Sequence, residues 1–443
     1  MKKVLIIANL FHSSPRIPGI TKYLLEFGWE SIILTVPIGK DFRNLLGFPA
    51  GFQEKVRIIE VPYHGDIFWF WRKIFKLFGF ATNKSILNQA KERTRIASQK
   101  SFIDRIFNLY QTIFGYPDDE RGWKKPAVRV GRKLLEKEKF DAIISSSSPV
   151  TAHIIANQLK SKYEQSSFGQ RKKIPWIADF RDLWTQNHNY PYPWWRKIIE
   201  RKLELKTLLL ANVLITVAGS ASEELGELHR GKETYTITNG FDPEKINNPP
   251  AELTSKFTIT YTGQIYSGKH DPSKLFSALK DLISDKTINP DDIEVRFYGP
   301  KTGWIEKEIE EYGLISIVKQ YGMVPREVSL KKQWESQILL KLNWEDSRFK
   351  GDYSGKIFEY LAAQRPILAT GGFGNNVTEK LLNGTKAGIY APTVEDIRKA
   401  LKEFYLEHKQ NGKVSYRGRW KEIKRYSYRE MAKKFTDVLN KIT

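Results

Sequence analysis

The chain lacks cysteine entirely, so disulfide bonds and cysteine-based zinc sites are excluded. It also lacks any run of about 18 uncharged apolar residues, so no transmembrane helix is predicted. Residues 1–8 resemble the start of a signal peptide, but the apolar run is short and no small-residue cleavage site follows it. We therefore interpret residues 4–8 as a first buried strand and expect a cytoplasmic protein. Tandem repeats and low-complexity tracts are absent as well.

Two further absences concern cofactors. No Gly-x-Gly-x-x-Gly motif follows the first strand, which disfavours a dinucleotide-dependent dehydrogenase. The acidic pairs Asp118–Asp119 and Asp291–Asp292 stand in polar, turn-like contexts rather than at a strand end. We therefore expect no metal site and no cofactor.

The composition is that of a large, globular and strongly basic protein. With 443 residues, 41% of them hydrophobic and 13% aromatic, the chain suits two domains of roughly 200 residues each. Its net charge of +22, from 72 basic and 50 acidic residues, favours an anionic partner: nucleic acid, a membrane surface or a phosphorylated substrate. No zinc-finger, helix-turn-helix or RNA-binding-sheet pattern is present, so we expect no nucleic acid and favour an anionic membrane surface.

The most informative stretch begins at Ser354. Residues 338–343 and 366–370 read as buried strands, so a loop and a helix connect them. Ser354 is a plausible N-cap, Gly355 allows a ligand close to the backbone, and Lys356 lies in the first helical turn. A cation is unfavourable at that end of a helix unless an anion rests on it and on the free N–H groups. The alternative is an ordinary turn with an exposed lysine.

Glu359 follows Lys356 by three positions and lies on nearly the same helical face. A phosphate site beside a carboxylate that accepts hydroxyl hydrogens suits a nucleotide sugar. Residues 354–367 resemble the donor-binding segment of family-4 glycosyltransferases, which have the GT-B fold. The resemblance implies that Glu359 binds the ribose hydroxyls. The family's usual earlier glutamate falls at Gly351 and is missing here.

A second donor segment follows the strand at residues 257–263. Gly263 ends that strand, and the loop that follows brings Lys269 to a candidate anion site. The same family commonly uses an arginine and a lysine of this loop to bind the donor diphosphate. Here Gln264 replaces the arginine, and Lys269 corresponds to the lysine. Stabilisation of the leaving diphosphate by Lys269 and Lys356 is expected to make the reaction independent of metal.

The first domain offers polar groups where strands end. The loop after residues 4–8 carries hydrogen-bonding side chains, and a serine-rich loop follows the strand at 140–145 and enters a helix. We expect these loops to bind the acceptor, although the serines could instead simply cap the helix. The candidate acceptor-binding residues are His12, Ser13, Ser14, Arg16, Ser147 and Ser148.

Three charged residues follow the strand at 176–178: Asp179, Arg181 and Asp182. Such a cluster at the end of a strand is more often functional than structural. The segment resembles the place where many family-4 enzymes carry a His-Asp pair near the reacting sugar, but no histidine stands here. Asp179 could orient or deprotonate an acceptor hydroxyl, and Arg181 could bind phosphate or neutralise the aspartates.

Two aromatic and basic patches suggest a membrane interface, where tryptophan, phenylalanine and lysine occur together. The alternative is a helical hairpin that packs on the core and covers the substrate. The patches contain Trp69, Phe70, Trp71, Arg72 and Lys73 in the first case, and Trp194 and Trp195 in the second.

The sequence therefore predicts two Rossmann-like, doubly wound α/β domains that face a cleft, which is the GT-B fold. Residues 1–248 are expected to bind the acceptor and 249–419 the nucleotide-sugar donor, with a helix at about 420–443 returning to the first domain. The expected function is transfer of a sugar to a lipid-linked or polysaccharide acceptor at the inner face of the plasma membrane. The resemblance implies retention of anomeric configuration. The alternatives are a nucleotide-sugar epimerase or hydrolase and a non-catalytic basic binding protein.

Overall fold

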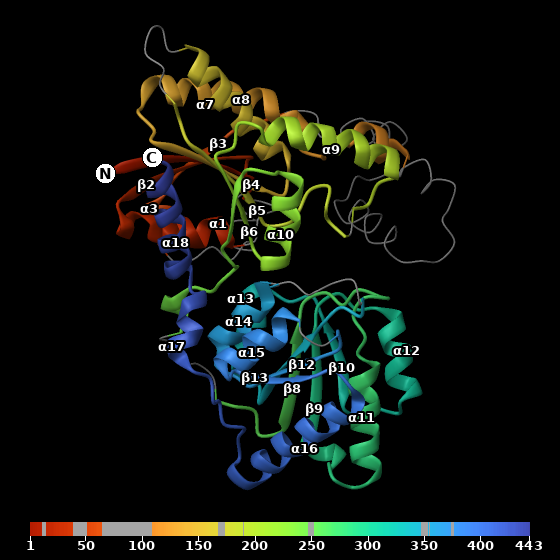
Figure 1. Ribbon diagram of the computed structural model, residues 1–443. Coiled ribbons are helices and arrows are strands. Elements are labelled where there is room, and N and C mark those ends of the chain that lie inside the picture. The colour runs from red at the N-terminus through yellow and green to blue at the C-terminus, as the bar shows by residue number, and fades with distance from the viewer. Residues whose placement is uncertain are drawn as a thin grey trace, which may run out of the picture. The chain divides into compact units, whose positions relative to one another are not determined.

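A computed structural model describes residues 1–10, 15–38, 51–63, 109–166, 173–188, 190–246, 252–346, 353, 355–373 and 376–443 (Figure 1). The chain divides into two compact units, the first formed by Met1–Ile237 with Ala432–Thr443 and the second by Thr238–Met431. Several candidate residues lie outside the described residues: His12, Ser13, Ser14, Trp69, Phe70, Trp71, Arg72, Lys73 and Ser354.

The described part of the first unit contains a seven-stranded sheet in which all neighbouring strands are parallel. Its strands, in spatial order, are β3 (Arg57–Glu60), β2 (Trp29–Thr35), β1 (Lys2–Ala8), β4 (Ala142–Ser147), β5 (Trp176–Phe180), β6 (Val213–Thr216) and β7 (Glu233–Thr236). Helices lie on both faces of this sheet in Figure 1: α7 (Lys124–Lys137), α8 (Thr151–Ser166) and α9 (Trp194–Leu208) on one, α1 (Arg16–Leu24), α10 (Gly219–Leu228) and α18 (Tyr428–Ile442) on the other.

The described part of the second unit contains a six-stranded sheet, again parallel throughout. Its order is β10 (Val318–Gly322), β9 (Ile293–Tyr298), β8 (Phe257–Thr262), β11 (Ile338–Leu342), β12 (Ile367–Thr370) and β13 (Gly388–Ala391). The longer helices are α11 (Ser273–Ser284), α12 (Gly303–Glu311), α13 (Arg326–Trp334), α14 (Gly355–Ala363), α15 (Val377–Thr385) and α16 (Val394–Asn411).

The central strands β1 and β11 are largely apolar and buried because helices cover both faces of each sheet, whereas the edge strands β3, β7 and β10 carry polar, partly exposed residues. Val4, Leu5 and Ile7 have no exposed surface, and the same holds for Leu339 and Leu340 in the second unit. The prediction of two doubly wound parallel sheets is confirmed. In each sheet the strand order reverses at one place, between β1 and β4 and between β8 and β11, and ligands bind such folds at the carboxyl ends of these strands.

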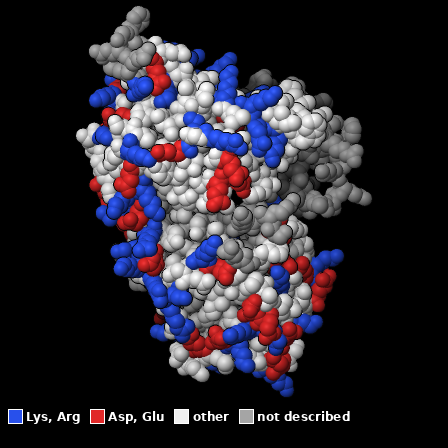
Figure 2. Space-filling model, in the orientation of Figure 1, with Lys and Arg blue, Asp and Glu red and all other residues white. Residues whose placement is uncertain are grey.

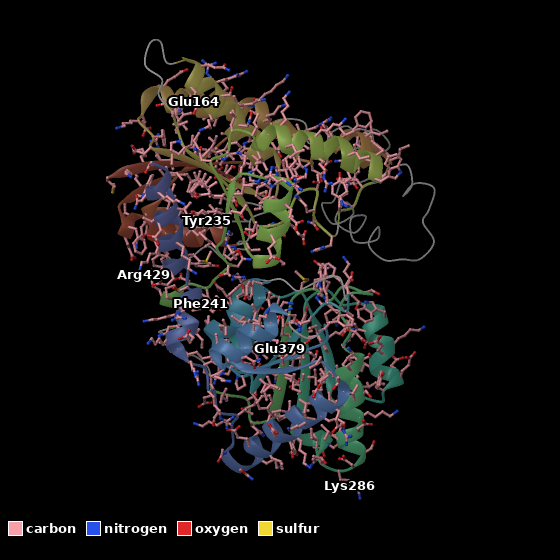
Figure 3. The ribbon with its side chains drawn as sticks, viewed as in Figure 1. Glu164, Tyr235, Phe241, Lys286, Glu379 and Arg429 are labelled. Atoms are coloured by element: carbon pink, nitrogen blue, oxygen red, sulfur yellow. The ribbon has the colours of Figure 1, made fainter. Side chains whose placement is uncertain are left out.

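Two helices of the second unit begin at residues whose side chains cap them. Asn376 caps α15 by accepting the backbone N–H of Glu379, which is labelled in Figure 3. Thr393 and Asp396 form a capping box at the start of α16.

Phe241, which is labelled in Figure 3, packs with Phe358 and Leu361 of α14 in one buried cluster. This packing anchors the helix that carries Lys356.

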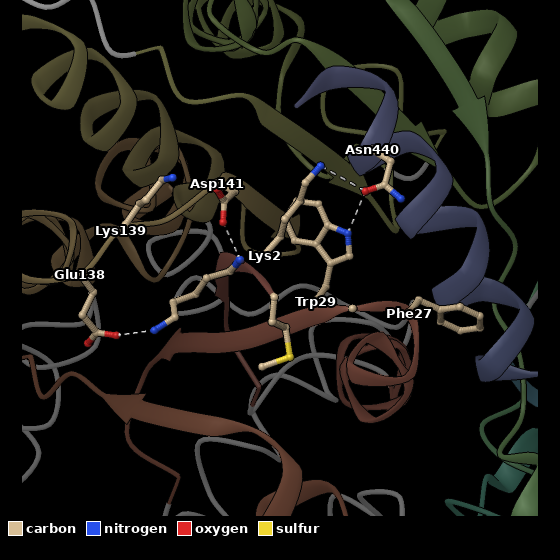
Figure 4. Close-up of a pocket in the computed structure, with 10 residues that line it drawn as sticks. Lys2, Phe27, Trp29, Glu138, Lys139, Asp141 and Asn440 are labelled. Carbon is tan, nitrogen blue, oxygen red and sulfur yellow. Dashed lines mark hydrogen bonds and ion pairs between the residues drawn. The ribbon is translucent and has the colours of Figure 1, made fainter.

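The final helix, α18, packs on the first unit through its last turns. Trp29 Nε1 and Lys2 Nζ both donate to Asn440 Oδ1, at 3.2 and 3.4 Å (Figure 4). Phe435 and Leu439 are fully buried. The chain thus crosses from the first unit to the second at Ile237–Thr238 and rejoins the first at Ala432.

Basic and acidic side chains are interspersed over the visible surface of both units (Figure 2). Among the described residues, no helix combines the length and apolar character needed to cross a membrane.

Candidate functional site

The turn after β8 in the second unit brings two predicted donor-binding residues together. Gly263 has a φ of +116°, and a Cβ atom added to it would lie only 2.8 Å from the Lys356 Nζ atom. Gly299, at the end of β9, packs against the Gly263 carbonyl in the same way. Glycine at 263 therefore supplies both the backbone conformation and the room that the lysine side chain needs.

Lys356 is held against apolar surroundings. Its Nζ lies 3.7 Å from the ring centroid of Tyr261, a residue that is almost fully buried. Burial lowers the pKa of Lys356 well below its usual range, and the neighbouring Lys341 lowers it further, against the opposing effect of Glu359. Among the described residues, no carboxylate forms a salt bridge with Lys356. A bound anion would restore the favourable charged state.

Three lysines surround one buried histidine at this place. Burial, and then the charges of Lys341, Lys356 and Lys269, lower the pKa of His270 to about 3. The backbone N–H of Tyr266 donates to His270 Nδ1 at 3.1 Å, so the proton of the neutral ring is on Nε2. Sequence reasoning missed His270, although its position directly after Lys269 was an available signal.

Of the other two lysines, Lys269 lies in the loop that follows β8 and Lys341 lies within β11. Lys269 Nζ lies 4.5 Å from the Trp344 ring centroid, as in a cation–π contact. Lys341 is buried in β11 and its ammonium donates to the Leu342 carbonyl at 2.8 Å. Together with Lys356 they concentrate positive charge where the strand order of this sheet reverses.

The start of α14 adds hydrogen-bond donors to this charge. The helix begins at Gly355, which is exposed, and a Cβ atom there would contact nothing within 4 Å. The N–H groups of a first helical turn have no partner inside the helix and favour anions. Gln264 is half-buried, and its backbone carbonyl accepts the Tyr261 hydroxyl at 2.9 Å.

Glu359, predicted to bind ribose hydroxyls, is engaged with a residue that the sequence did not single out. Arg326 Nη2 lies 2.7 Å from Glu359 Oε1, and Gln333 Nε2 lies 3.5 Å from the other carboxylate oxygen. Gln333 also donates to Thr262 Oγ1 at 3.0 Å, which links this group to β8. The carboxylate is thus held in one orientation with its second oxygen only weakly bonded to protein.

In the first unit, two candidate residues are bonded to each other. Arg16 Nη2 donates to Asp179 Oδ1 at 2.7 Å, and Arg16 Nε lies 3.1 Å from Oδ2. Ser146 completes the arrangement by donating to Oδ2 at 2.7 Å. Asp179 has no exposed surface and Arg16 only 2%. The charges of this pair therefore compensate each other inside the protein, below the carboxyl ends of β4 and β5.

The remaining charged candidates lie nearer the surface. Arg181 Nε is 3.2 Å from Asp182 Oδ2, and Ser147 donates to the Asp182 carbonyl at 3.4 Å. Arg181 and Ser148 both line a cavity of about 370 Å³. The structure therefore divides the charged candidates of the first unit into the buried pair Arg16 and Asp179 and the more exposed pair Arg181 and Asp182.

His153, at the start of α8, is a further residue that sequence reasoning did not assign. Trp176 Nε1 donates to Ser145 Oγ at 2.8 Å, and Ser145 in turn lies 2.7 Å from His153 Nδ1. Burial lowers the pKa of His153 to about 3, so the imidazole is neutral at physiological pH. Its ring packs on Phe180, with the centroids 4.4 Å apart. The serine-rich loop signalled this region, but not its histidine.

A larger cavity of about 750 Å³ lies at the opposite edge of the first sheet (Figure 4). It is lined by the beginnings of strands, including Lys2, Lys3 and Trp29, and by Asp141 and Asn440. Ligands of open α/β sheets bind at the carboxyl ends of strands. This cavity is therefore not the candidate active site.

Of the comparisons with known proteins, the one with solved structures shows the fold. No protein-family model matches the chain, and no curated protein matches it in sequence. Among solved structures, sucrose-phosphate synthase from Thermosynechococcus elongatus has a TM-score of 0.58 at 12% identity, covering 100% of this chain and 99% of that one. A glycosyltransferase from Rickettsia africae ESF-5 has a TM-score of 0.57 at 15% identity, covering 100% and 98%.

A third similar structure is that of the lipopolysaccharide outer core galactosyltransferase WaaB, with a TM-score of 0.54 at 12% identity and 99% of each chain covered. The fold is that of GT-B glycosyltransferases. Family 4 is not distinguished within that fold, because sequence identities this low show only the architecture.

Proposed function

We propose that the protein is a glycosyltransferase that takes its sugar from a nucleotide-sugar donor bound by the second unit. One observation carries this proposal: Lys356, whose ammonium is poorly solvated, lies beside two further lysines and the start of α14, where the strand order of the sheet reverses. Positive charge held in a poorly solvated place is unfavourable by itself and becomes favourable when a diphosphate binds.

The donor diphosphate gains negative charge as the bond to the sugar breaks. Lys356, Lys269 and the first N–H groups of α14 would stabilise that charge in the transition state. This set supplies the positive charge that a metal ion would otherwise bring, and we propose a metal-independent reaction. Retention of configuration is proposed from the resemblance of residues 354–367 to the family-4 donor segment.

Glu359 would accept hydrogen bonds from the ribose hydroxyls of the donor. Its ion pair with Arg326 leaves the oxygen that faces Gln333 only weakly bonded, at 3.5 Å. Arg326 would act as a positioning residue, since it holds the carboxylate in one orientation without touching the reacting atoms. Gly263 and Gln264 would line the diphosphate side of the site.

The acceptor would bind at the carboxyl edge of the first sheet. Arg181, Asp182 and Ser148 supply accessible polar groups there. Ser147 and Asp179 are buried and would act through their bonds to the Asp182 carbonyl and to Arg16. We propose a glycan acceptor, carried on a lipid or a polysaccharide, with the reaction on the cytoplasmic side of a membrane. The likeness to a lipopolysaccharide outer core galactosyltransferase supports this class of acceptor.

The proposal is tested by measuring thermal unfolding with UDP, GDP, ADP and their sugars. A nucleotide that binds only the folded state stabilises it by about 2.7 kcal/mol at a concentration 100 times its Kd. We expect one base to raise the Tm clearly and the matching nucleotide sugar to be consumed only when an acceptor is present. Absence of any shift would overturn the donor site. Consumption of the donor at the same rate without acceptor would instead indicate a hydrolase or an epimerase.

A further inference from the structure

Helix α9 presents an unusually apolar outer face. Trp194 is 75% exposed, Ile198 50% and Leu209, directly after the helix, 71%. Large apolar side chains that gather on one exposed face mark an interaction surface, whereas single exposed ones do not. We define the α9 outer face by its exposed residues: Trp194, Trp195, Ile198, Ile199, Arg201, Lys202, Leu205, Lys206 and Leu209.

The acidic residues of α9 all point inward. Glu200 is bonded to Arg196 at 2.7 Å and accepts Trp184 Nε1 at 2.8 Å. Glu204 accepts the backbone N–H of Thr185 at 3.1 Å. Both glutamates are buried, so the outer face carries only apolar and positively charged side chains. An ordinary surface helix buries its apolar face and exposes its charged face. In α9 the carboxylates are buried and many large apolar side chains are exposed.

The inward side of α9 is firmly attached to the first unit. The buried Arg196 guanidinium donates to the backbone carbonyls of Gln111, Thr112 and Gly115, at 2.9, 2.7 and 2.7 Å. It also lies 3.3 Å from the ring centroid of Tyr192. These bonds determine which side of the helix faces outward, so the exposure of the tryptophans follows from a specific polar core.

A basic cavity borders this face. Lys206 lines a cavity of about 570 Å³ together with Arg121, Lys124 and Lys125, and none of the described residues that line it is acidic. Two of these lysines open helix α7, whose first turn contains no acidic residue, so the positive end of the helix adds to their charge. In Figure 2, basic side chains gather at the upper right of the first unit, where α9 runs in Figure 1.

We propose that the α9 outer face lies on the surface of a bilayer that contains anionic lipids. The tryptophans, isoleucines and leucines would enter the interfacial layer, while Lys202, Lys206 and the basic cavity would contact lipid phosphates. A second copy of the chain is a poor occupant of this face. A two-fold contact would bring Arg201, Lys202 and Lys206 against the same positive face, with no carboxylate on it to pair them. The inference does not depend on the reaction that the protein catalyses.

The absence of cysteine makes a direct test possible, because one introduced cysteine is the only site of labelling. Ile198→Cys, labelled with a polarity-sensitive fluorophore, is mixed with vesicles of phosphatidylcholine alone or with added phosphatidylglycerol. The matched control is Ile315→Cys, at a residue of the second unit that is 63% exposed. We expect a blue shift at position 198 with the anionic vesicles at low salt, a smaller shift at high salt, and none at position 315.

The basic component is tested with Lys202→Glu/Lys206→Glu, measured by co-sedimentation with the same vesicles. A basic residue near an anionic surface contributes about 1 kcal/mol, or roughly fivefold in affinity, so the double variant should bind at least about 25-fold more weakly. Lys280→Glu/Lys307→Glu changes two exposed lysines of the second unit and has the same net charge, so it controls for overall charge. Thermal unfolding of each variant verifies that it folds.

Three outcomes would overturn the proposal. The first is equal weakening by both double variants, which would show binding through overall charge alone. The second is a blue shift at position 198 without vesicles, which would indicate self-association. The third is no binding of the wild-type protein to anionic vesicles at low salt. If the fluorescence of the label at position 198 shifts only when an acidic protein is added, the partner of this face is a protein and not a membrane.

Discussion

The two sheets of this protein reverse their strand order in the same way, but the charged residues near the reversal are arranged differently in each. In the first unit, Arg16 and Asp179 neutralise each other below the strand ends, and both are buried. In the second unit, three lysines surround His270, and Lys356 has no salt-bridge partner among the described residues. The same topology thus supports a neutralised buried ion pair in one unit and a concentration of positive charge around a buried histidine in the other.

This difference indicates which unit is better suited to bind the diphosphate of the proposed donor. A neutralised buried pair has no electrostatic need for a ligand, whereas concentrated positive charge in poorly solvated surroundings does. The two buried histidines illustrate the point. Burial alone accounts for most of the low pKa of His153, while His270 feels three lysines in addition. A diphosphate should therefore bind beside His270.

The largest effect is expected from Asp179→Asn in the first unit. Removing one partner of a buried ion pair leaves Arg16 charged and uncompensated, which costs about 3–5 kcal/mol of unfolding free energy. Denaturant unfolding of the full chain measures this loss. Arg16→Met/Asp179→Asn removes both charges and should recover part of the stability. A single variant as stable as the wild type would show that the pair is not sequestered as described.

Lys356→Met should have the opposite character. It removes the proposed contact with the leaving diphosphate, so kcat/KM should fall by about 100- to 1,000-fold. The free protein should lose no stability, because a desolvated charge is replaced by an apolar side chain. Activity and Tm are measured together, with Lys280→Met, an exposed lysine of α11, as the control. If Lys356→Met retained its activity, Lys356 would not be part of the donor site.

Gly263→Ala should have an intermediate effect. The added Cβ atom would lie 2.8 Å from Lys356 Nζ and displace the ammonium, so we expect roughly tenfold weaker binding of the nucleoside diphosphate, or about 1.4 kcal/mol. Gly313→Ala is the matched control, since its φ is also positive, at +72°, but its Cβ atom would contact nothing. Both variants bear backbone strain, so equal losses of affinity would attribute the effect to strain rather than to Lys356.

The smallest effect concerns protons. The lowered pKa of Lys356 means that, between that pKa and the usual value of about 10.5, the unfolded chain binds more protons, so stability rises with pH there. A bound diphosphate should raise this pKa, so binding should take up protons at pH values above the lowered pKa and should weaken as pH rises. Calorimetry in buffers of different ionisation enthalpy measures the uptake. Lys356→Met should abolish it, and uptake that persists in the variant would contradict the assignment.

Several features of the structure could be predicted from short stretches of the sequence. The apolar runs at residues 4–8 and 338–342 predict buried parallel strands, because strands covered on both faces need no alternation. The position of Lys356 in the first turn of α14 followed from the turn sequence, and Trp194 and Trp195 suggested an exposed aromatic patch before any helix could be oriented. These features depend on neighbours a few residues away, which a sequence displays directly.

Only the tertiary structure decided which charges meet. Arg16 and Asp179 are 163 residues apart, and Glu359 finds Arg326 on another helix, so neither pairing has a local signal. The same holds for the three lysines that converge on His270 and for the inward turn of Glu200 and Glu204, which leaves α9 apolar and basic outside. The physical reason is that desolvation and Coulomb interactions depend on distance in space, which chain separation does not reveal.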